Sequence, residues 1–220
     1  MNHEALVFAN DKEFGLRPSK ESSLEGWDLE WKEIQAVTMG VGWVAVANDE
    51  LIRVFNLMGH PVNSIAFDRQ IVAMHGYENM LAVVFHEGVP IWGAQQLAMQ
   101  LFMIDAERQQ FRLVDTLHVP IKPGQQLKWF NFSREGMIFS QDTVGVVRCF
   151  SMETNQWTRV VVQNIEEHLQ HKIWIISFGN YCVDYWRISD QDPEPTVAPR
   201  FSTKTSELAI PVIGILPNNT

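Results

Sequence analysis

Two histidines stand out first, because their types and spacing could support metal chemistry. His168 and His171 lie three positions apart and follow Glu166 and Glu167, and a helical cluster of Glu and His of this kind could bind a metal ion. However, no cysteine or further histidine lies near them in the sequence. An exposed polar turn explains the four residues more simply, so we expect no metal site.

Asp142 and Asp184 are the second candidates, as a pair of carboxylates for glycoside chemistry. Glycosidases bring a pair of Asp or Glu side chains together around the bond they cleave, and these two occupy suitable positions in the repeat described below. Each also fits the ordinary role of a residue at a turn or a strand edge. The chain contains no Gly-x-Ser-x-Gly elbow and no glycine-rich phosphate loop. We therefore expect no enzyme and no cofactor.

The overall composition argues against a nucleic-acid-binding function. The chain has 220 residues, 46% of them hydrophobic, and a formal net charge of −9, which is an ordinary globular composition without the clustered Lys and Arg of a nucleic-acid site. An acidic surface suits basic protein partners instead. No stretch approaches the length of a membrane span, and no secretory signal is visible. Cys149 and Cys182 lie in apolar strand patterns, which predicts buried thiols in a reducing compartment.

The elements that would position any site are hairpins, and one hairpin pattern recurs four times. In each, a short apolar strand is followed ten positions after its start by a second strand. Hairpins of fixed length that recur at intervals of about 40 to 50 residues are typical of propeller blades. The first strands begin at Ile34, Ile71, Leu127 and Ile173, and the second strands at Val44, Leu81, Met137 and Val183.

These hairpins predict an all-β fold built from four-stranded antiparallel propeller blades. About fifteen short strands are expected, which makes about four blades, at the low limit for propellers. The strand expected at Ala5–Ala9 starts without a preceding partner. We therefore expect residues 1–220 to form a single domain that is incomplete at its N-terminus and belongs to a larger propeller of about six blades.

The first and third hairpins match beyond their turns. In both, a turn that carries Asp leads to a strand with Arg between apolar neighbours and then Phe, so that Arg53 corresponds to Arg148 and Phe55 to Phe150. Strand alternation predicts that both arginines face solvent and that both phenylalanines face the core.

Three segments depart from the blade pattern. Lys12–Gly26 is polar and is expected to be an insertion, and Glu87–Gln96 carries glycines, a proline and a tryptophan and is expected to be a blade loop. Asn164–Gln170 is the only helical suggestion, with Asn164 as its cap. Loops carry function more often than strands do.

We therefore select Trp92 and Glu87, in the second of these segments, as the candidate residues for contact with a partner. The alternative for Trp92 is a side chain that anchors the loop on its own blade.

The order of the motifs resembles the SepB propeller of the replisome hub family called AND-1 in animals and chromosome transmission fidelity factor four in yeast. The similarity runs from about Ser22 to Pro211. Its first motifs are a Gly-x-Gly-Trp strand and a Leu-x-Arg-x-Phe strand. The residues of this chain that match are Gly40, Gly42, Trp43, Leu51, Arg53, Phe55, His75, Gly76, His86, Gln96, Leu97, Gln100, Leu101, Leu127, Trp129, Phe132, Ser133, Gly136, Asp142, Gly145, Val147, Arg148 and Trp157.

The resemblance implies a nuclear, non-enzymatic scaffold in DNA replication. Members of this family look like homotrimers that tether the replicative helicase, including its GINS component, to DNA polymerase α–primase. Their groove for short client peptides lies in a helical domain without a counterpart in these 220 residues, so peptide capture is not carried over. Apart from the resemblance, the alternative function is a WD-like platform for protein interaction in trafficking, chromatin or ribosome assembly.

Overall fold

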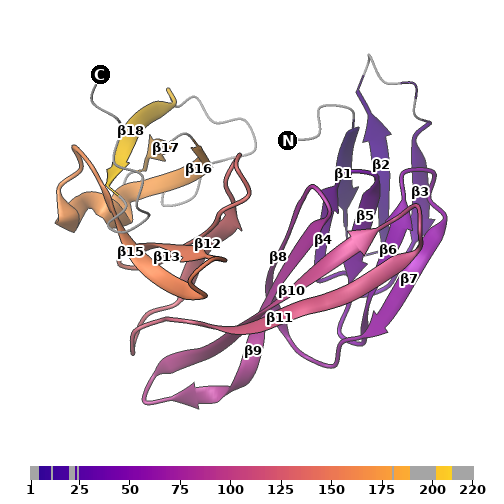
Figure 1. Cartoon of the computed structure of the whole chain (residues 1–220), viewed down its shortest axis with the longest axis horizontal. Coiled ribbons are helices and arrows are strands. Elements are labelled where there is room, and N and C mark those ends of the chain that lie inside the picture. The colour runs from indigo at the N-terminus through magenta and orange to yellow at the C-terminus, as the bar shows by residue number, and fades with distance from the viewer. Residues whose placement is uncertain are drawn as a thin grey trace. The chain divides into compact units, whose positions relative to one another are not determined.

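The computed structural model describes residues 5–10, 12–19, 23, 25–179, 181–188 and 202–209. Over these residues the chain forms 18 strands, paired antiparallel in four sheets, and one short 3-10 helix, η1 (Glu167–Lys172) (Figure 1). The predicted all-β class is therefore confirmed. The chain folds as two compact units, Met1–Pro120 (unit 1) and Ile121–Thr220 (unit 2), and each is described by itself.

Unit 1 contains three successive sheets, in each of which every strand pairs with the next one along the chain. The first sheet has three described strands, and the second and third have four. The sheets are β1 (Ala5–Ala9), β2 (Glu13–Pro18) and β3 (Trp27–Glu30); β4 (Ala36–Gly40), β5 (Trp43–Ala47), β6 (Leu51–Asn56) and β7 (Pro61–Ala66); β8 (Ile71–Tyr77), β9 (Met80–Ile91), β10 (Ala94–Asp105) and β11 (Gln110–Val119).

Successive sheets of unit 1 meet through their first strands, since β4 contacts both β1 and β8. Two hydrogen bonds join the second sheet to the third. The Gly76 N–H donates to Thr38 Oγ1 (2.9 Å), and the Val41 N–H donates to the Glu78 carbonyl oxygen (2.8 Å). Contacts between first strands are what the blades of a propeller make around their axis.

Apolar layers fill the spaces between the sheets of unit 1. Phe14, Leu16 and Phe55 belong to the layer between the first and second sheets, and Trp43 and Phe85 to the layer between the second and third. Each of these side chains is at most 4% exposed. Burial of a side chain of this size stabilises the fold by about 1.5–3 kcal/mol, so these layers hold neighbouring sheets face to face.

Unit 2 is built on one seven-stranded sheet with the order β12-β13-β14-β15-β18-β17-β16. Strand β18 pairs with β15 on one side and with β17 on the other, and so joins a four-stranded meander to a hairpin. The strands are β12 (Leu127–Phe132), β13 (Ile138–Asp142), β14 (Val147–Ser151), β15 (Gln156–Val162), β16 (Ile173–Gly179), β17 (Cys182–Arg187) and β18 (Lys204–Ala209).

The four predicted hairpins are present as β4–β5, β8–β9, β12–β13 and β16–β17. Three of their first strands begin at the predicted residue, and β4 begins at Ala36 instead of Ile34. Short apolar runs separated by turn residues are therefore enough to locate these hairpins.

Two segments and the domain division differ from the expectation. Lys12–Gly26, expected as a polar insertion, contains β2, because Phe14 and Leu16 are fully buried against the neighbouring sheet. Glu87–Gln96, expected as a loop, is the paired end of β9 and β10. The single domain expected over residues 1–220 is divided into two compact units.

The expected helix Asn164–Gln170 is a 3-10 helix that begins at Glu167 instead. Asn164 has a positive φ of 59°, which belongs to a turn and not to a helix cap. The residue in the cap position is Glu166, and no side chain there makes a capping hydrogen bond. The predicted cap at Asn164 is therefore wrong.

Candidate partner-binding surface

A two-stranded extension of the third sheet is the candidate surface. Strand β9 pairs with β8 as far as Phe85, and β10 pairs with β11 from Leu97 onwards. Residues Glu87–Gln96 continue beyond these ladders, paired only with one another. We call these residues the β9–β10 extension. Figure 1 shows it leaving the body of its sheet at the bottom of the view.

The tip of the extension is a tight turn that presents a tryptophan. Ile91 pairs with Ala94, which leaves Trp92 and Gly93 as the two loop residues. Both have positive φ, 53° and 74°, as in the type I′ turns that suit hairpins. The left-handed conformation is unusual for a bulky side chain and costs on the order of 1 kcal/mol or more. The fold holds Trp92 there although the ring gains almost no burial.

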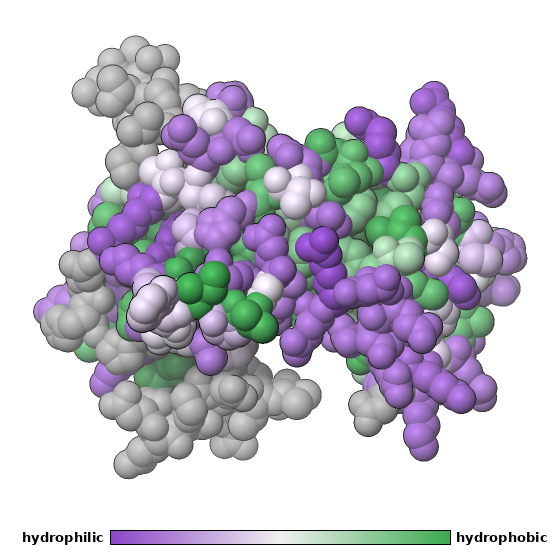
Figure 2. Space-filling model, turned by 90° about the horizontal axis from the view of Figure 1, so that it is seen from below, coloured by the Kyte–Doolittle hydropathy of each residue, from purple (hydrophilic) through white to green (hydrophobic). Residues whose placement is uncertain are grey.

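The exposure of the tip is high. Trp92 is 92% exposed, Val89 80% and Ile91 53%, and Glu87 is also exposed. Trp92 therefore does not anchor the extension on its own blade. Figure 2 shows the face toward which the extension points, with apolar surface lying among polar side chains. Val89 and Ile91 are not among the residues predicted from the sequence. The apolar run Val89-Pro90-Ile91-Trp92, within a segment expected to be a loop, could have indicated them.

The two predicted contact residues lie on this one extension, Glu87 on β9 and Trp92 at the turn. Exposed aromatic side chains are the type most often found at the energetic centre of protein interfaces. The extension presents an apolar tip at Trp92 and an acidic residue, Glu87, at its base. It is therefore the candidate for a docking surface.

The Gly-x-Gly-Trp motif has a structural role elsewhere in unit 1. The Trp43 ring is fully buried between Gly40 and Gly76, and its Nε1–H donates to the Glu78 carbonyl oxygen (2.8 Å). A Cβ on Gly40 would collide with the ring and with that carbonyl, and a Cβ on Gly76 would lie 2.7 Å from the ring. Gly42 supplies the positive φ (81°) that the turn before Trp43 requires.

The two matching arginines differ in the structure. Arg53 lies with its guanidinium 4.8 Å from the centre of the Trp31 ring. Arg148 is buried (7% exposed) and donates from Nη1 to Asp142 Oδ2 at 2.9 Å. The expectation that both arginines face solvent is therefore wrong for Arg148. At the turn before Arg53, the backbone N–H groups donate to Asn48. Asn48 is neutral, so it cannot form the ion pair with Arg53 that Asp142 forms with Arg148.

Several other residues of these motifs serve packing or a turn. Phe55 and Phe150 are buried as predicted, 4% and 3% exposed. Trp157 lies 5.3 Å from Phe150, and Trp129 meets the Phe178 ring edge-on at 5.2 Å. Gly136 has a φ of 83° in the turn between β12 and β13.

The carboxylates considered for catalysis are each held by their own arginine. Asp142 is fully buried, accepts from Arg148, and also accepts the Val146 N–H (2.9 Å). Asp184 accepts from Arg134 Nη2 (2.9 Å) and from Thr205 Oγ1 (2.7 Å). The two carboxylates share no partner, so the structure does not assemble them into a pair. Both are accounted for as structural ion pairs.

The histidine cluster cannot be placed in the same way. The side chains of His168 and His171 lie outside the described residues. Among the residues that are described, no three His, Cys, Asp or Glu side chains come together as a metal site. No helix in the described part of the chain is long and apolar enough to cross a bilayer.

Comparison with known families and proteins adds an independent result. Residues 1–212 match the family model of the minichromosome loss protein, Mcl1, middle region. WD repeat and HMG-box DNA-binding protein 1 is 31% identical in Mus musculus and 30% identical in Homo sapiens, over 80% of this chain and 17% of the relative in both cases. Protein ENHANCER OF LHP1 1 of Arabidopsis thaliana is 29% identical over 83% of this chain and 20% of its own length. The chain thus spans at most a fifth of the length of these relatives.

Solved structures of low identity show the fold. A chain in the crystal structure of the mitotic checkpoint complex superposes with a TM-score of 0.53 at 10% identity, over 84% of this chain and 59% of that one. The β-propeller domain of Myceliophteria thermophila Cps50 (Swd1) gives 0.50 at 11% identity, over 87% and 65%. The predicted propeller is confirmed by this similarity.

Proposed function

Because this chain belongs to the family of the middle region of the minichromosome loss protein Mcl1, we propose that it is the propeller module of a non-enzymatic scaffold in DNA replication. Membership is supported over most of the chain, and propellers commonly serve as platforms for other proteins. The formal charge of −9 suits protein partners better than a phosphate backbone.

The finer proposal takes the scaffold to be nuclear and to couple the GINS-containing replicative helicase to DNA polymerase α–primase, as a homotrimer. Its support is the resemblance of the motif order, together with relatives whose names describe WD-repeat and HMG-box proteins that bind DNA. Because the chain spans only part of those relatives, this proposal concerns the whole protein that contains the chain.

The observation that carries the proposal for this chain is the exposed β9–β10 extension. A tryptophan that is 92% exposed at the tip of a hairpin gains nothing for the fold, but it can bury on the order of 150–250 Å² of its surface in a partner. Glu87 adds a negative charge at the base, which favours a partner with a basic rim around an apolar pocket. We assign the contact with a replication partner to Trp92 and Glu87.

The test compares two variants in replicating cells. The protein that contains this chain is tagged and purified with its partners, as wild type, as Trp92→Ala and as Met58→Ala. Met58 is a matched control, because it is an exposed apolar residue (65%) at another hairpin turn of unit 1. We expect Trp92→Ala to reduce recovery of GINS or of polymerase α subunits and Met58→Ala to recover both. Equal recovery of both partners from all three proteins would refute the assignment of this surface.

The oligomeric state has its own experiment. The purified chain is examined by size-exclusion chromatography with light scattering at micromolar concentration, where we expect three times the mass of the 25.3 kDa monomer. A stable monomer would contradict trimer formation through this module. It would leave the pull-down result to decide the contact with replication partners.

A further inference from the structure

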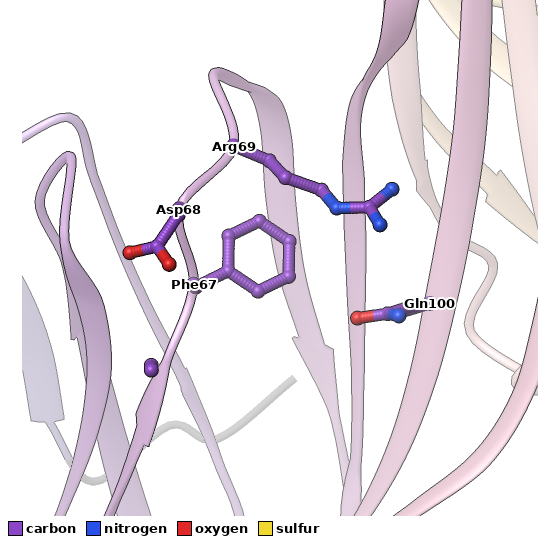
Figure 3. A pocket seen from close by; sticks show the side chains of 5 residues that line it. Phe67, Asp68, Arg69 and Gln100 are labelled. Carbon is purple, nitrogen blue, oxygen red and sulfur yellow. The ribbon is translucent and has the colours of Figure 1, made fainter.

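A pocket opens on the rim of unit 1, between its second and third sheets. It is lined by Ala66, Phe67, Asp68, Arg69 and Gln100. The first four residues follow one another from the end of β7 into the turn before β8, and Gln100 lies on β10. Figure 3 shows the Arg69 and Gln100 side chains entering the same space, while Asp68 lies on the other side of Phe67.

The aromatic rings beneath the pocket hold the Arg69 side chain in place. Its guanidinium lies 4.8 Å from the centre of the Phe85 ring, and Phe67 packs edge-on against Phe85 at 5.4 Å. Both rings are buried, with 5% or less of each residue exposed. The Arg69 N–H donates to the Phe67 carbonyl oxygen (2.8 Å), which fixes the backbone of the turn. The guanidinium is thus positioned before any ligand arrives.

The charge of Arg69 is not used within the described part of the chain. Four other arginines, Arg17, Arg108, Arg134 and Arg148, form ion pairs with aspartates there. Arg69 forms no ion pair or side-chain hydrogen bond among the described residues, although the chain carries a net charge of −9. A stacked guanidinium keeps its in-plane N–H groups free, and those groups match a carboxylate in a two-pronged geometry.

The neighbouring strands suit an extended peptide. β7, whose last residue lines the pocket, and β11 are the outermost strands of their sheets, and they contact each other. Edge strands offer backbone N–H and C=O groups that an added segment can pair with. Gln100, one strand in from β11, adds an amide that can donate to an anion and accept from a backbone N–H.

We infer that this pocket binds the carboxylate of a Glu or Asp side chain carried by an extended segment of a partner protein. The Arg69 guanidinium pairs with the carboxylate, the Gln100 amide donates to it, and the segment runs along the rim between β7 and β11. A carboxylate is favoured over a phosphate, because Asp68 lies next to Arg69 in the chain and its negative charge opposes a dianion more strongly than a monoanion. This surface is distinct from the β9–β10 extension and does not depend on the replication proposal.

The experiment uses the ¹⁵N-labelled 220-residue chain and three synthetic peptides observed by NMR. The probes are acetyl-Ser-Thr-Val-X-Val-Thr-Ser-amide with glutamate, glutamine or phosphoserine at X. We expect the glutamate peptide to shift the Gln100 side-chain amide and the Arg69 Nε–H resonances in a saturable manner. The glutamine peptide should shift neither, and the phosphoserine peptide should bind more weakly than the glutamate peptide.

Two variants separate recognition from folding. Arg69→Lys keeps the positive charge over the Phe85 ring but loses the planar pair of donors, so we expect about tenfold weaker binding. Arg53→Ala, which removes an arginine stacked on Trp31, should bind the glutamate peptide as the wild type does. Equal binding of glutamate and glutamine peptides, tighter binding of phosphoserine, or unchanged affinity in Arg69→Lys would each overturn the inference. None of these results bears on the pull-down or on the oligomeric state.

Discussion

Arg148 and Asp142 form a buried ion pair across the turn between β13 and β14, with 2.9 Å between Nη1 and Oδ2 and side-chain exposures of 8% and 0%. Asp142 also closes the turn, because its other carboxylate oxygen accepts the Val146 N–H. Asp142 therefore fixes the backbone of the turn and also neutralises the buried charge of Arg148.

Asp142→Asn should strongly destabilise unit 2. The asparagine keeps an oxygen for the Val146 N–H but leaves the Arg148 guanidinium buried without its counter-charge, at a cost of about 3–5 kcal/mol. Urea denaturation at neutral pH measures the loss. The control is the double variant Asp142→Asn with Arg148→Met, which removes both charges and should recover most of the stability. A single variant as stable as the wild type would show that the ion pair is not needed.

Gly40→Ala should destabilise unit 1 by at least about 2 kcal/mol, because the added methyl group meets the Trp43 ring and the Glu78 carbonyl. Gly88→Ala is the matched control in the same unit. A Cβ at Gly88 meets nothing within 4 Å, so this variant should unfold at the same urea concentration as the wild type or slightly above it. Similar midpoints for the two variants would contradict the close approach.

His75 should make the stability fall as the solution becomes acidic. Burial lowers the pKa of His75 from 6.5 to about 4. Between these two pH values the unfolded chain binds a proton at His75 that the folded chain does not bind. The effect is absent above pH 6.5, grows as the pH falls from 6.5 to 4, and amounts to about 2 kcal/mol at pH 5. Urea denaturation of the wild type and of His75→Gln at pH 7.5 and pH 5 isolates this contribution. His60→Gln, at an exposed turn, should retain the wild-type difference, and the same pH dependence in His75→Gln would disprove the assignment.

The two thiols should react at different rates. Cys149 is buried, and burial raises its pKa to about 11, whereas Cys182 is only half-buried, with a pKa raised first by burial and then by the Asp184 carboxylate. We expect a thiol reagent at pH 8 to label Cys182 in the folded chain and Cys149 only after unfolding in urea. Cys182→Ser should abolish the labelling of the folded chain. Fast labelling of that variant would mean that Cys149 is accessible.

The sequence predicts the hairpins well because their information is local. The short apolar runs of a hairpin and the turn residues between them lie within about sixteen positions of each other, and the turn glycine Gly42 can be recognised from its neighbours. The extension was found for the same reason, since Gly88, Pro90 and Gly93 interrupt the blade pattern. The continued pairing of β9 with β10 along the extension is not predicted, because the pattern of apolar residues does not show where a strand ladder ends.

The remaining features depend on residues that are distant in sequence. Gly76 must be glycine because the Met39 carbonyl group and the Trp43 ring, both from another hairpin, lie against it. The burial of Arg148 depends on which residue starts the preceding turn, Asp142 here and Asn48 in the matching hairpin. Arg69 is placed by the buried rings of Phe67 and Phe85. A single sequence records the residues of such contacts but not their partners.

Strand β18 sets the order in which unit 2 can be completed during synthesis. Val161 on β15 pairs with Ala209, and Cys182 on β17 pairs with Glu207. Strands β15 and β17 are synthesised before β18, so each has an unpaired edge until the residues of β18 have left the ribosome. Strand pairings between residues so distant in sequence form late, because closing the long loop between them costs conformational entropy before the pairing can compensate it. Ribosome-bound chains that stop before Lys204 should therefore expose two unpaired strand edges, the kind of surface that chaperones recognise and that promotes aggregation.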